Sequence, residues 1–243
     1  MYKKKMKSGL VCVFDILDYN NIMENECTVD CAIILEGILI DLPQNTISKY
    51  LSMYPNIFTM DEMLNFYNDH YRYIMAMDSI IMTFDYENLL ESEKSKSIIL
   101  SILIIIHFQF LSFEHGYPMR SCIDFGPFSC YGNIFAGKTI ENCSNKSHKL
   151  DFSGIIITEN ANKYFINSNN EYGDKFIEQY IFKYIVQFYN GLEDKKYPID
   201  LYTTSFDASV TIIFKEKMIN TFEKRYNNII NTFKKIINME IKN

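Results

Sequence analysis

The sequence lacks several features that would assign it to a common class of protein. Its 243 residues contain no GxSxG nucleophile motif, which weakens the hydrolase alternative. The six cysteines form no CxxC pair, so we expect reduced core residues in preference to a zinc site or disulfide framework. No stretch rich in Pro, Gly or Ser divides the chain, which predicts one domain over residues 1–243.

Positive charge and long apolar runs are also scarce. The 24 basic and 30 acidic residues give a net charge of −6, which repels polyanions and argues against broad nucleic-acid binding. The apolar run at residues 98–113 is shorter than the roughly 20 residues of a spanning helix, and it contains His107 and Gln109, which favours a buried core helix. The apolar run after the basic N-terminus contains Asp15, unlike a signal peptide. We therefore expect a cytoplasmic protein with no membrane or nucleic-acid partner.

What is present is an ordinary globular composition, with 48% hydrophobic and 22% charged residues. Apolar periodicity and turn residues give the expected elements. Strands are expected at residues 10–17, 71–77, 79–85, 119–125, 128–134, 154–158, 180–188 and 200–204, and helices at residues 29–53, 92–115, 137–150, 160–165 and 214–239. This order predicts an α+β fold with its core at about residues 9–205, helices on one face of a sheet, and a C-terminal amphipathic helix at residues 214–239.

Two carboxylates stand out because they interrupt apolar strands. Asp15 lies within the run 11–17, and Asp78 lies between the apolar residues 74–77 and 80–82. An ionised carboxylate in such a place needs a partner or a cation, and two of them could hold the divalent ions of a phosphoryl-transfer site. Taken singly, each also has a structural interpretation, as a cap at a strand end or a residue of a hairpin turn.

Four segments resemble class III nucleotide cyclases, in family order and at family-like spacing. They cover most of residues 9–165 and read VFDILDYNN, AMDSIIMTFD, MRSCIDFGPF and AGKTIENCSNKSHKLDFSGIIIT. The resemblance implies a mostly antiparallel sheet with helices packed on it and a ferredoxin-like βαββαβ core. It gives Asp15 and Asp78 the catalytic role of binding two Mg²⁺ or Mn²⁺ ions, with Ile16 as a further metal ligand.

Within this family the chain is most similar to the pyrimidine cyclases of bacterial Pycsar antiphage defence. That likeness implies conversion of UTP or CTP into a 3′,5′-cyclic nucleotide and pyrophosphate by a head-to-tail homodimer. The cyclic product would act on a separate effector protein. The alternatives are an adenylate or guanylate cyclase with unusual base contacts, and a degenerate cyclase-like module that binds a nucleotide without turnover.

The resemblance also implies a set of substrate contacts. The backbone amides of residues 16–19, which are Ile16, Leu17, Asp18 and Tyr19, would cradle phosphate oxygens. Asp18 stands where the family often has Gly. Arg120 is a candidate for a phosphate contact or for a structural ion pair. Lys138, Lys146 and Lys149 are candidates for further positive charge, although lysines on a helix are more often solvated.

Three positions depart from the purine-specific enzymes of the family. Met75 replaces the base-reading Lys or Glu, while Glu141 and Asn145 replace the Asn and Arg that hold ribose and stabilise the transition state. The purine mechanism therefore cannot be transferred residue by residue. The histidines show no metal-ligand spacing, so all four are expected to be structural or exposed: His70, His107, His115 and His148.

Overall fold

The apolar run near the N-terminus forms the central strand of the fold. The computed structural model describes residues 6–17, 19, 28–53, 57–150, 153–167, 181–185 and 198–202. Strand β1 covers Lys7–Ile16, and its residues from Gly9 onward are buried. Such burial requires that both faces of the sheet be covered at β1. Within the sheet β1 is central, because it is paired with β3 along one edge and with β4 along the other.

The remaining elements follow the order expected from the sequence, with one helix added. That helix, α3, lies between α2 and β2, and a capping box of Thr59 and Glu62 begins it. The elements after β1 are α2 Thr28–Met53, α3 Met60–His70, β2 Tyr71–Ala76, β3 Ser79–Asp85, α4 Glu91–Glu114, β4 Met119–Tyr131, β5 Ile134–Ala136, α5 Lys138–Ser147, β6 Gly154–Ile157, α6 Glu159–Asn167, β7 Ile181–Ile185 and β8 Pro198–Tyr202.

The strands of the described residues form one mixed sheet of eight strands, in the order β2-β3-β1-β4-β6-β8-β7, with β5 paired to β4. The pairs β2–β3, β1–β3 and β1–β4 are antiparallel, whereas β4 and β6 are parallel. The order β2-β3-β1-β4, with helices between β1 and β2 and between β3 and β4, is the ferredoxin-like arrangement. The predicted α+β class and βαββαβ core are thereby confirmed.

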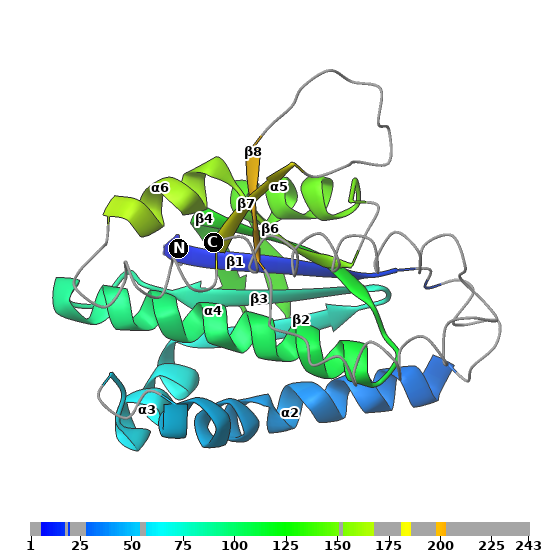
Figure 1. The fold of residues 1–243 in the computed structure, drawn as a ribbon, viewed down its shortest axis with the longest axis horizontal. Helices are drawn as coiled ribbons and strands as arrows, with labels where there is room; N and C mark the ends of the chain where they lie inside the picture. The colour runs from blue at the N-terminus through cyan, green and yellow to red at the C-terminus, as the bar shows by residue number, and fades with distance from the viewer. Residues whose placement is uncertain are drawn as a thin grey trace, which may run out of the picture.

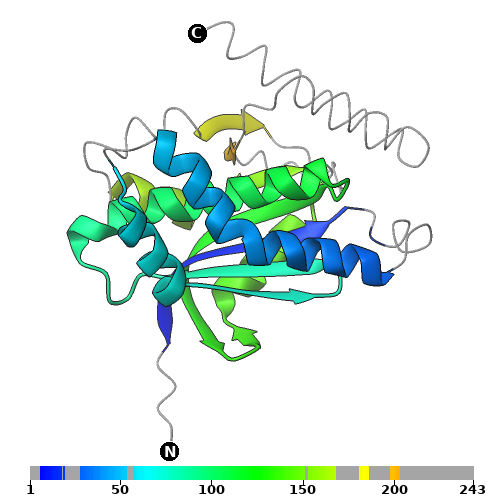
Figure 2. The same ribbon diagram turned by 90° about the horizontal axis from the view of Figure 1, so that it is seen from below.

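Helices cover both faces of the sheet, and the expectation of helices on one face was wrong. Alternate residues of β1 point to opposite sides: Cys12 and Phe14 belong to the larger core under α2, α3 and α4, and Val11 and Val13 to a smaller core with Ile140 of α5. Figures 1 and 2 show α2, α3 and α4 on one side of the sheet and α5 on the other. Since β1 is apolar at both alternating sets of positions, it has to be covered on both faces.

Strand β4 runs without interruption through Gly126 and Pro127, the two residues that separate the predicted strands 119–125 and 128–134 and that favour a turn. Both residues pair with β1, as Gly126 with Gly9 and Pro127 with Ser8. Along the edge of β4 that faces away from β1, β6 pairs only with residues from Arg120 to Ile123. No hydrogen bond to β6 is therefore required of Pro127. Proline is tolerated where no ladder hydrogen bond is required of it, and the turn comes later, between β4 and β5.

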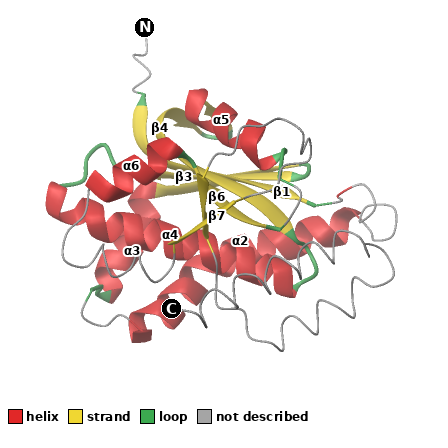
Figure 3. Cartoon of the chain, turned by 45° about the horizontal axis from the view of Figure 1, so that its top comes forward, coloured by secondary structure: helices red, strands yellow, loops and turns green. Residues whose placement is uncertain are grey.

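Helix α4 is a core helix, as its apolar composition predicted. Among the described residues it is the one helix long and apolar enough to span a membrane, and 83% of its apolar window is buried inside the fold. It begins at Glu91, one residue before the predicted start at residue 92, and the Glu93 carboxylate accepts a hydrogen bond from the amide of the N-cap residue Leu90 at 2.9 Å. Figure 3 shows it packed beside the strands, on the same side of the sheet as α2.

The cysteines in the described part of the chain are free, as expected from their spacing. Cys12, Cys31, Cys122 and Cys143 are buried, and Cys130 is partly buried.

The strands predicted at residues 180–188 and 200–204 correspond to β7 and β8. The polar composition of residues 167–174 predicts a mobile loop; apart from Asn167, this segment and the predicted helix at residues 214–239 lie outside the described residues.

We expect acid to destabilise the protein through His107. Burial, with a smaller contribution from Lys49, lowers the pKa of His107 from 6.5 to about 4, so below pH 6.5 the unfolded chain binds more protons than the folded one. Stability should fall as the pH drops from 6.5 through 4, by about 3 kcal/mol for this group. Urea unfolding at pH 7 and pH 4 should show a smaller acid loss for His107→Gln, whereas exposed His115→Gln should keep the wild-type loss. An equal loss in His107→Gln would contradict this assignment.

Candidate metal centre

Asp15 lies at the end of β1, between the two neighbouring strands. It is opposite Ser79 of β3 and Arg120 of β4, and none of its surface is exposed. Its Oδ2 accepts a hydrogen bond from the Arg120 guanidinium, but its buried Oδ1 has no hydrogen-bond partner. A buried acceptor without a partner costs about 1–3 kcal/mol, so this oxygen is suited to a cation.

Asp78 approaches the same point from the turn between β2 and β3. Met77, just before it, has a φ of 55° and is 86% exposed, which marks a tight left-handed turn. The Asp78 carbonyl accepts a hydrogen bond from the Ile16 amide at 2.8 Å, and Ser79 Oγ donates to Asp78 Oδ1 at 3.3 Å. The hairpin is therefore fixed to the end of β1, which holds the two carboxylates near each other.

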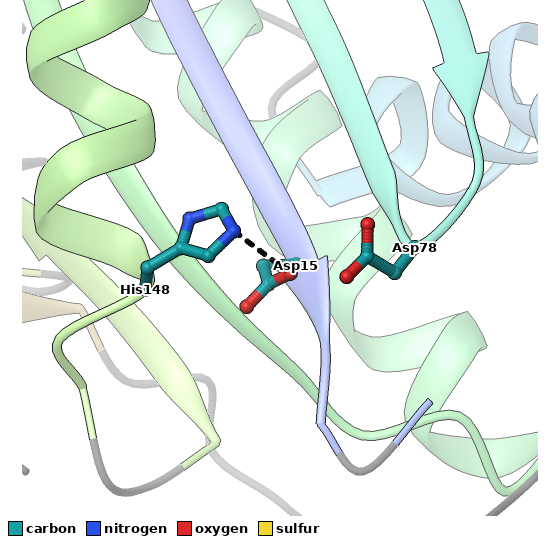
Figure 4. A group of neighbouring side chains, drawn as sticks. All are labelled: Asp15, Asp78 and His148. Carbon is teal, nitrogen blue, oxygen red and sulfur yellow. Dashed lines mark ion pairs between the residues drawn. The ribbon is translucent and has the colours of Figure 1, made fainter. Parts of the chain in front are cut away.

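His148 joins these carboxylates from the end of α5. Its Nε2 lies 3.6 Å from Asp15 Oδ1, and one ligand atom from each of Asp15, Asp78 and His148 lies within 4.8 Å of the others. Figure 4 shows the imidazole and the two carboxylates converging from α5, β1 and the hairpin. The ring is exposed, as predicted, and it also lies beside the two carboxylates. Sequence spacing carries no signal for this contact, which depends on α5 packing against β1.

The electrostatics of Asp15 favour a cation at its free oxygen. Burial raises the pKa of the Asp15 carboxyl, the Arg120 guanidinium and His148 lower it, and Asp78 raises it further. The net upward direction means that the arginine does not fully offset the cost of burying the carboxylate beside a second one. A divalent cation would stabilise both ionised groups, and the residues present therefore fit a metal ion.

Arg120 acts here as a structural partner of Asp15. Its Nε donates to Asp15 Oδ2, and its Nη1 donates to the Leu150 carbonyl at 3.1 Å. The ion-pair interpretation from the sequence is thus the one seen in the structure, and the phosphate-contact interpretation has no support from these contacts. With Oδ2 engaged, Asp15 presents Oδ1 toward His148.

Two of the four amides of the predicted phosphate cradle are engaged within the fold. The Ile16 amide donates to Asp78 and the Leu17 amide donates to the Pro118 carbonyl at 2.9 Å, so neither N–H is free for a phosphate oxygen and this part of the prediction was wrong. Ile16 can bind a metal only through its carbonyl oxygen, and that role stays a prediction. Asp18 lies outside the described residues, and the Tyr19 side chain packs partly buried against the larger core.

The other residues singled out from the sequence are paired elsewhere, exposed or packed in the core. Lys138 begins α5, whose ten residues span about 15 Å, and its Nζ pairs with Glu141 at 3.1 Å. Lys149 and Asn145 are exposed. Met75 packs against the larger core. Substrate roles for Lys138 and Lys149 stay predictions, and the ion pair of Lys138 with Glu141 does not favour the first of them.

Gly137 explains why a glycine precedes α5. Its φ is 145°, and a Cβ at this position would lie 2.9 Å from Phe128 Cα, so a larger residue would push the helix away from β4. Thr139 Oγ1 then donates to the Pro127 carbonyl at 2.8 Å, which ties the first turn of α5 to the strand. This close packing brings the far end of α5, and with it His148, to Asp15.

Comparison with known proteins gives a similarity at the level of fold. No family model matches the sequence, and no curated protein matches it. The catalytic core of a rhodopsin-guanylyl cyclase with converted specificity, in complex with ATPαS, is 10% identical over 84% of this chain and 98% of that chain, with a TM-score of 0.50.

Two further cyclase domains show weaker likeness. A double mutant of the RhoGC guanylyl cyclase domain from Blastocladiella emersonii is 11% identical over 82% of this chain and 95% of that chain, with a TM-score of 0.49. The guanylate cyclase domain of RhGC from Catenaria anguillulae, in complex with GTP, is 11% identical over 84% and 100% of the two chains, with a TM-score of 0.46.

The chain therefore has the fold of a class III nucleotide cyclase catalytic domain. The sheet order, the two-sided helix layer and the similarity to a cyclase core support this assignment together. In this fold, the carboxylates of Asp15 and Asp78 lie at one end of the sheet, where β1 ends and the β2–β3 hairpin turns.

Proposed function

We propose that the protein is a metal-dependent nucleotide cyclase that converts UTP or CTP into a 3′,5′-cyclic nucleotide and pyrophosphate. The observation that carries the proposal is the convergence of Asp15 and Asp78, whose ligand atoms lie within 4.8 Å of each other in a cyclase-like fold. Two carboxylates at this separation can share divalent cations beside a triphosphate. The resemblance of the four sequence segments to pyrimidine cyclases supports the choice of substrate.

The residues at the site would contribute mainly by positioning and charge. When bound, Mg²⁺ or Mn²⁺ lowers the pKa of the ribose 3′-hydroxyl and neutralises charge on the triphosphate. Asp15 and Asp78 would hold the cations, and Arg120 keeps Asp15 oriented with one oxygen free. Because Asp15 is fully buried, its charge is less screened by water, which strengthens its interaction with a cation.

The choice of base depends on the resemblance and on Met75. The Met75 side chain packs partly buried against the larger core. Its thioether has no hydrogen-bond donor to offer to a purine. Adenylate or guanylate cyclase activity is the alternative within enzymes, since a structure with a similar fold was determined with ATPαS. Glu141, paired with Lys138, is the feature that favours a degenerate module, because it lies where the purine enzymes have a ribose-binding Asn.

Incubation of the pure protein with each of the four NTPs and Mn²⁺ or Mg²⁺ tests the proposal. We expect a cyclic pyrimidine nucleotide and pyrophosphate, identified by mass spectrometry, and no product after EDTA treatment. A cyclic purine product would favour the adenylate or guanylate cyclase. Nucleotide binding without product from any NTP would favour the degenerate module.

We also propose that the active form is a homodimer and that its product serves as a second messenger in antiphage defence. Both follow from the resemblance. Helix α2 carries exposed apolar residues at helical spacing, Val29 at 60%, Ile33 at 59% and Ile40 at 62%, and exposed apolar surface of this kind is suited to a protein partner. Light scattering with and without nucleotide would show whether a dimer forms.

A further inference from the structure

We propose that His148 is a third protein ligand of the cation held by Asp15 and Asp78, and that the site therefore prefers Mn²⁺ or a similar transition-metal ion to Mg²⁺. This inference rests on the proposed function for the presence of a cation and adds to it the ligand set and the metal preference. His148 is a residue of this chain that sequence spacing did not connect with the carboxylates.

The distance between His148 and Asp15 is that of two ligands of one ion. His148 Nε2 and Asp15 Oδ1 are 3.6 Å apart, which is too long for a hydrogen bond. Two metal–ligand bonds of about 2.1 Å at octahedral or tetrahedral angles separate their ligand atoms by roughly 3.0–3.5 Å. A cation between them needs an adjustment of only tenths of an ångström.

The hydrogen bond on the other side of the ring fixes His148 for this role. Its Nδ1 lies 2.7 Å from the Ser144 carbonyl. A carbonyl oxygen can only accept, so Nδ1 carries the proton. In the neutral ring Nε2 then has its lone pair directed at Asp15. Metal-binding histidines generally donate their second ring N–H to a carbonyl or carboxylate in this way, and the bond holds both tautomer and orientation.

A second, independent observation at Asp15 points to a ligand. Asp15 is completely buried, and its Oδ1 has no hydrogen-bond partner although Oδ2 is paired with Arg120. The unpartnered oxygen is the atom that faces His148 Nε2. Asp78 is partly exposed and His148 is 46% exposed at its side chain, so an ion can enter from solvent and keep water or nucleotide oxygens as further ligands.

The mixed ligand set determines the preference for the metal. Mg²⁺ binds oxygen ligands and keeps several waters, whereas imidazole nitrogen is a ligand of first-row transition ions, whose affinity for such a site is lowest for Mn²⁺ and rises through Co²⁺. An imidazole beside two carboxylates therefore adds affinity for Mn²⁺ and little for Mg²⁺. We expect the wild-type protein to bind Mn²⁺ about tenfold or more tightly than Mg²⁺.

The test measures binding of the metal alone, without nucleotide. Mn²⁺ binding is followed by the electron paramagnetic resonance signal of the free ion, and nitrogen coupling to bound Mn²⁺ by pulsed resonance. His148→Ala should weaken Mn²⁺ binding about tenfold or more and remove the nitrogen coupling, while Mg²⁺ binding measured by calorimetry changes by less than about threefold. His148→Gln, which keeps the size of the side chain, should behave in the same way.

His115→Gln is the matched control, because it removes an exposed imidazole that is not among the three converging residues. It should keep wild-type Mn²⁺ affinity and nitrogen coupling. Wild-type affinity in both His148 variants, no nitrogen coupling in the wild type, or no Mn²⁺ binding at all would overturn the inference. Coupling that depends on His148 in a protein that forms no cyclic product would support the ligand set while removing the proposed function.

Discussion

Replacement of Asp78 by Asn is expected to reduce formation of cyclic product about 10³-fold, because loss of one carboxylate removes several kcal/mol of stabilisation supplied through the bound ions. Stability should hardly change. Asp78 is partly exposed in a turn, its backbone carbonyl still accepts from the Ile16 amide, and an Asn side chain can still accept from Ser79 Oγ. Initial rates with the preferred NTP and Mn²⁺, together with a thermal melt, measure both effects.

Asp41→Asn serves as the control for Asp78→Asn, since it removes one exposed carboxylate of α2 and leaves the site unchanged. It should retain wild-type rates. Substantial activity in Asp78→Asn at saturating Mn²⁺ would contradict the metal-ligand role of Asp78. A fall in the melting temperature of Asp78→Asn comparable to that of a core substitution would instead show that the hairpin, and not the chemistry, depends on this carboxylate.

Replacement of Asp15 by Ala should abolish product formation and also destabilise the fold, by about 3 kcal/mol. Asp15 is fully buried, and the Arg120 side chain that it pairs with is 16% exposed. Removing the carboxylate leaves a largely buried guanidinium with its remaining hydrogen bond to the Leu150 carbonyl, and an unpaired buried charge is costly. Urea unfolding at pH 7 gives the free energy of unfolding directly.

The double variant Asp15→Ala with Arg120→Met tests how much of the lost stability comes from leaving the Arg120 guanidinium unpaired. Removal of both charges should recover about 1–3 kcal/mol relative to Asp15→Ala, because no unpaired cation is left. Activity should stay absent in both. If Asp15→Ala unfolds at the same urea concentration as the wild type, relief of the repulsion from Asp78 outweighs the loss of the arginine, and the stabilising role of this ion pair is refuted.

Much of the fold could be predicted because its elements have strong local signals. The β-branched run of β1, the hairpin around Asp78 and the long apolar helix α4 were placed within a few residues of their observed bounds. Their residues satisfy the simple periods of strand and helix. The convergence of Asp15 and Asp78 was predicted from the cyclase resemblance, and the antiparallel pairing of β1 with β3 brings them together.

The predictions that failed concern contacts between distant segments. Gly126 and Pro127 suggest a turn from local composition, but pairing with Gly9 and Ser8 extends β4 through them. The amides of Ile16 and Leu17 appeared available for phosphate in the sequence, yet Asp78 and Pro118 accept from them. Helix α3 was missed, although Thr59 and Glu62 carry the spacing of a capping box that could have indicated it.

By itself, the sequence determined which carboxylates interrupt apolar strands, since burial of a charge in such a run has to be compensated wherever the strand lies. Only the tertiary structure decided what compensates it. Arg120 reaches Asp15 because β4 pairs with β1 in that register, and His148 reaches it because Gly137 lets α5 pack closely on the sheet. Neither neighbour is encoded by spacing along the chain, because both contacts depend on strand register and helix packing between segments far apart in the sequence.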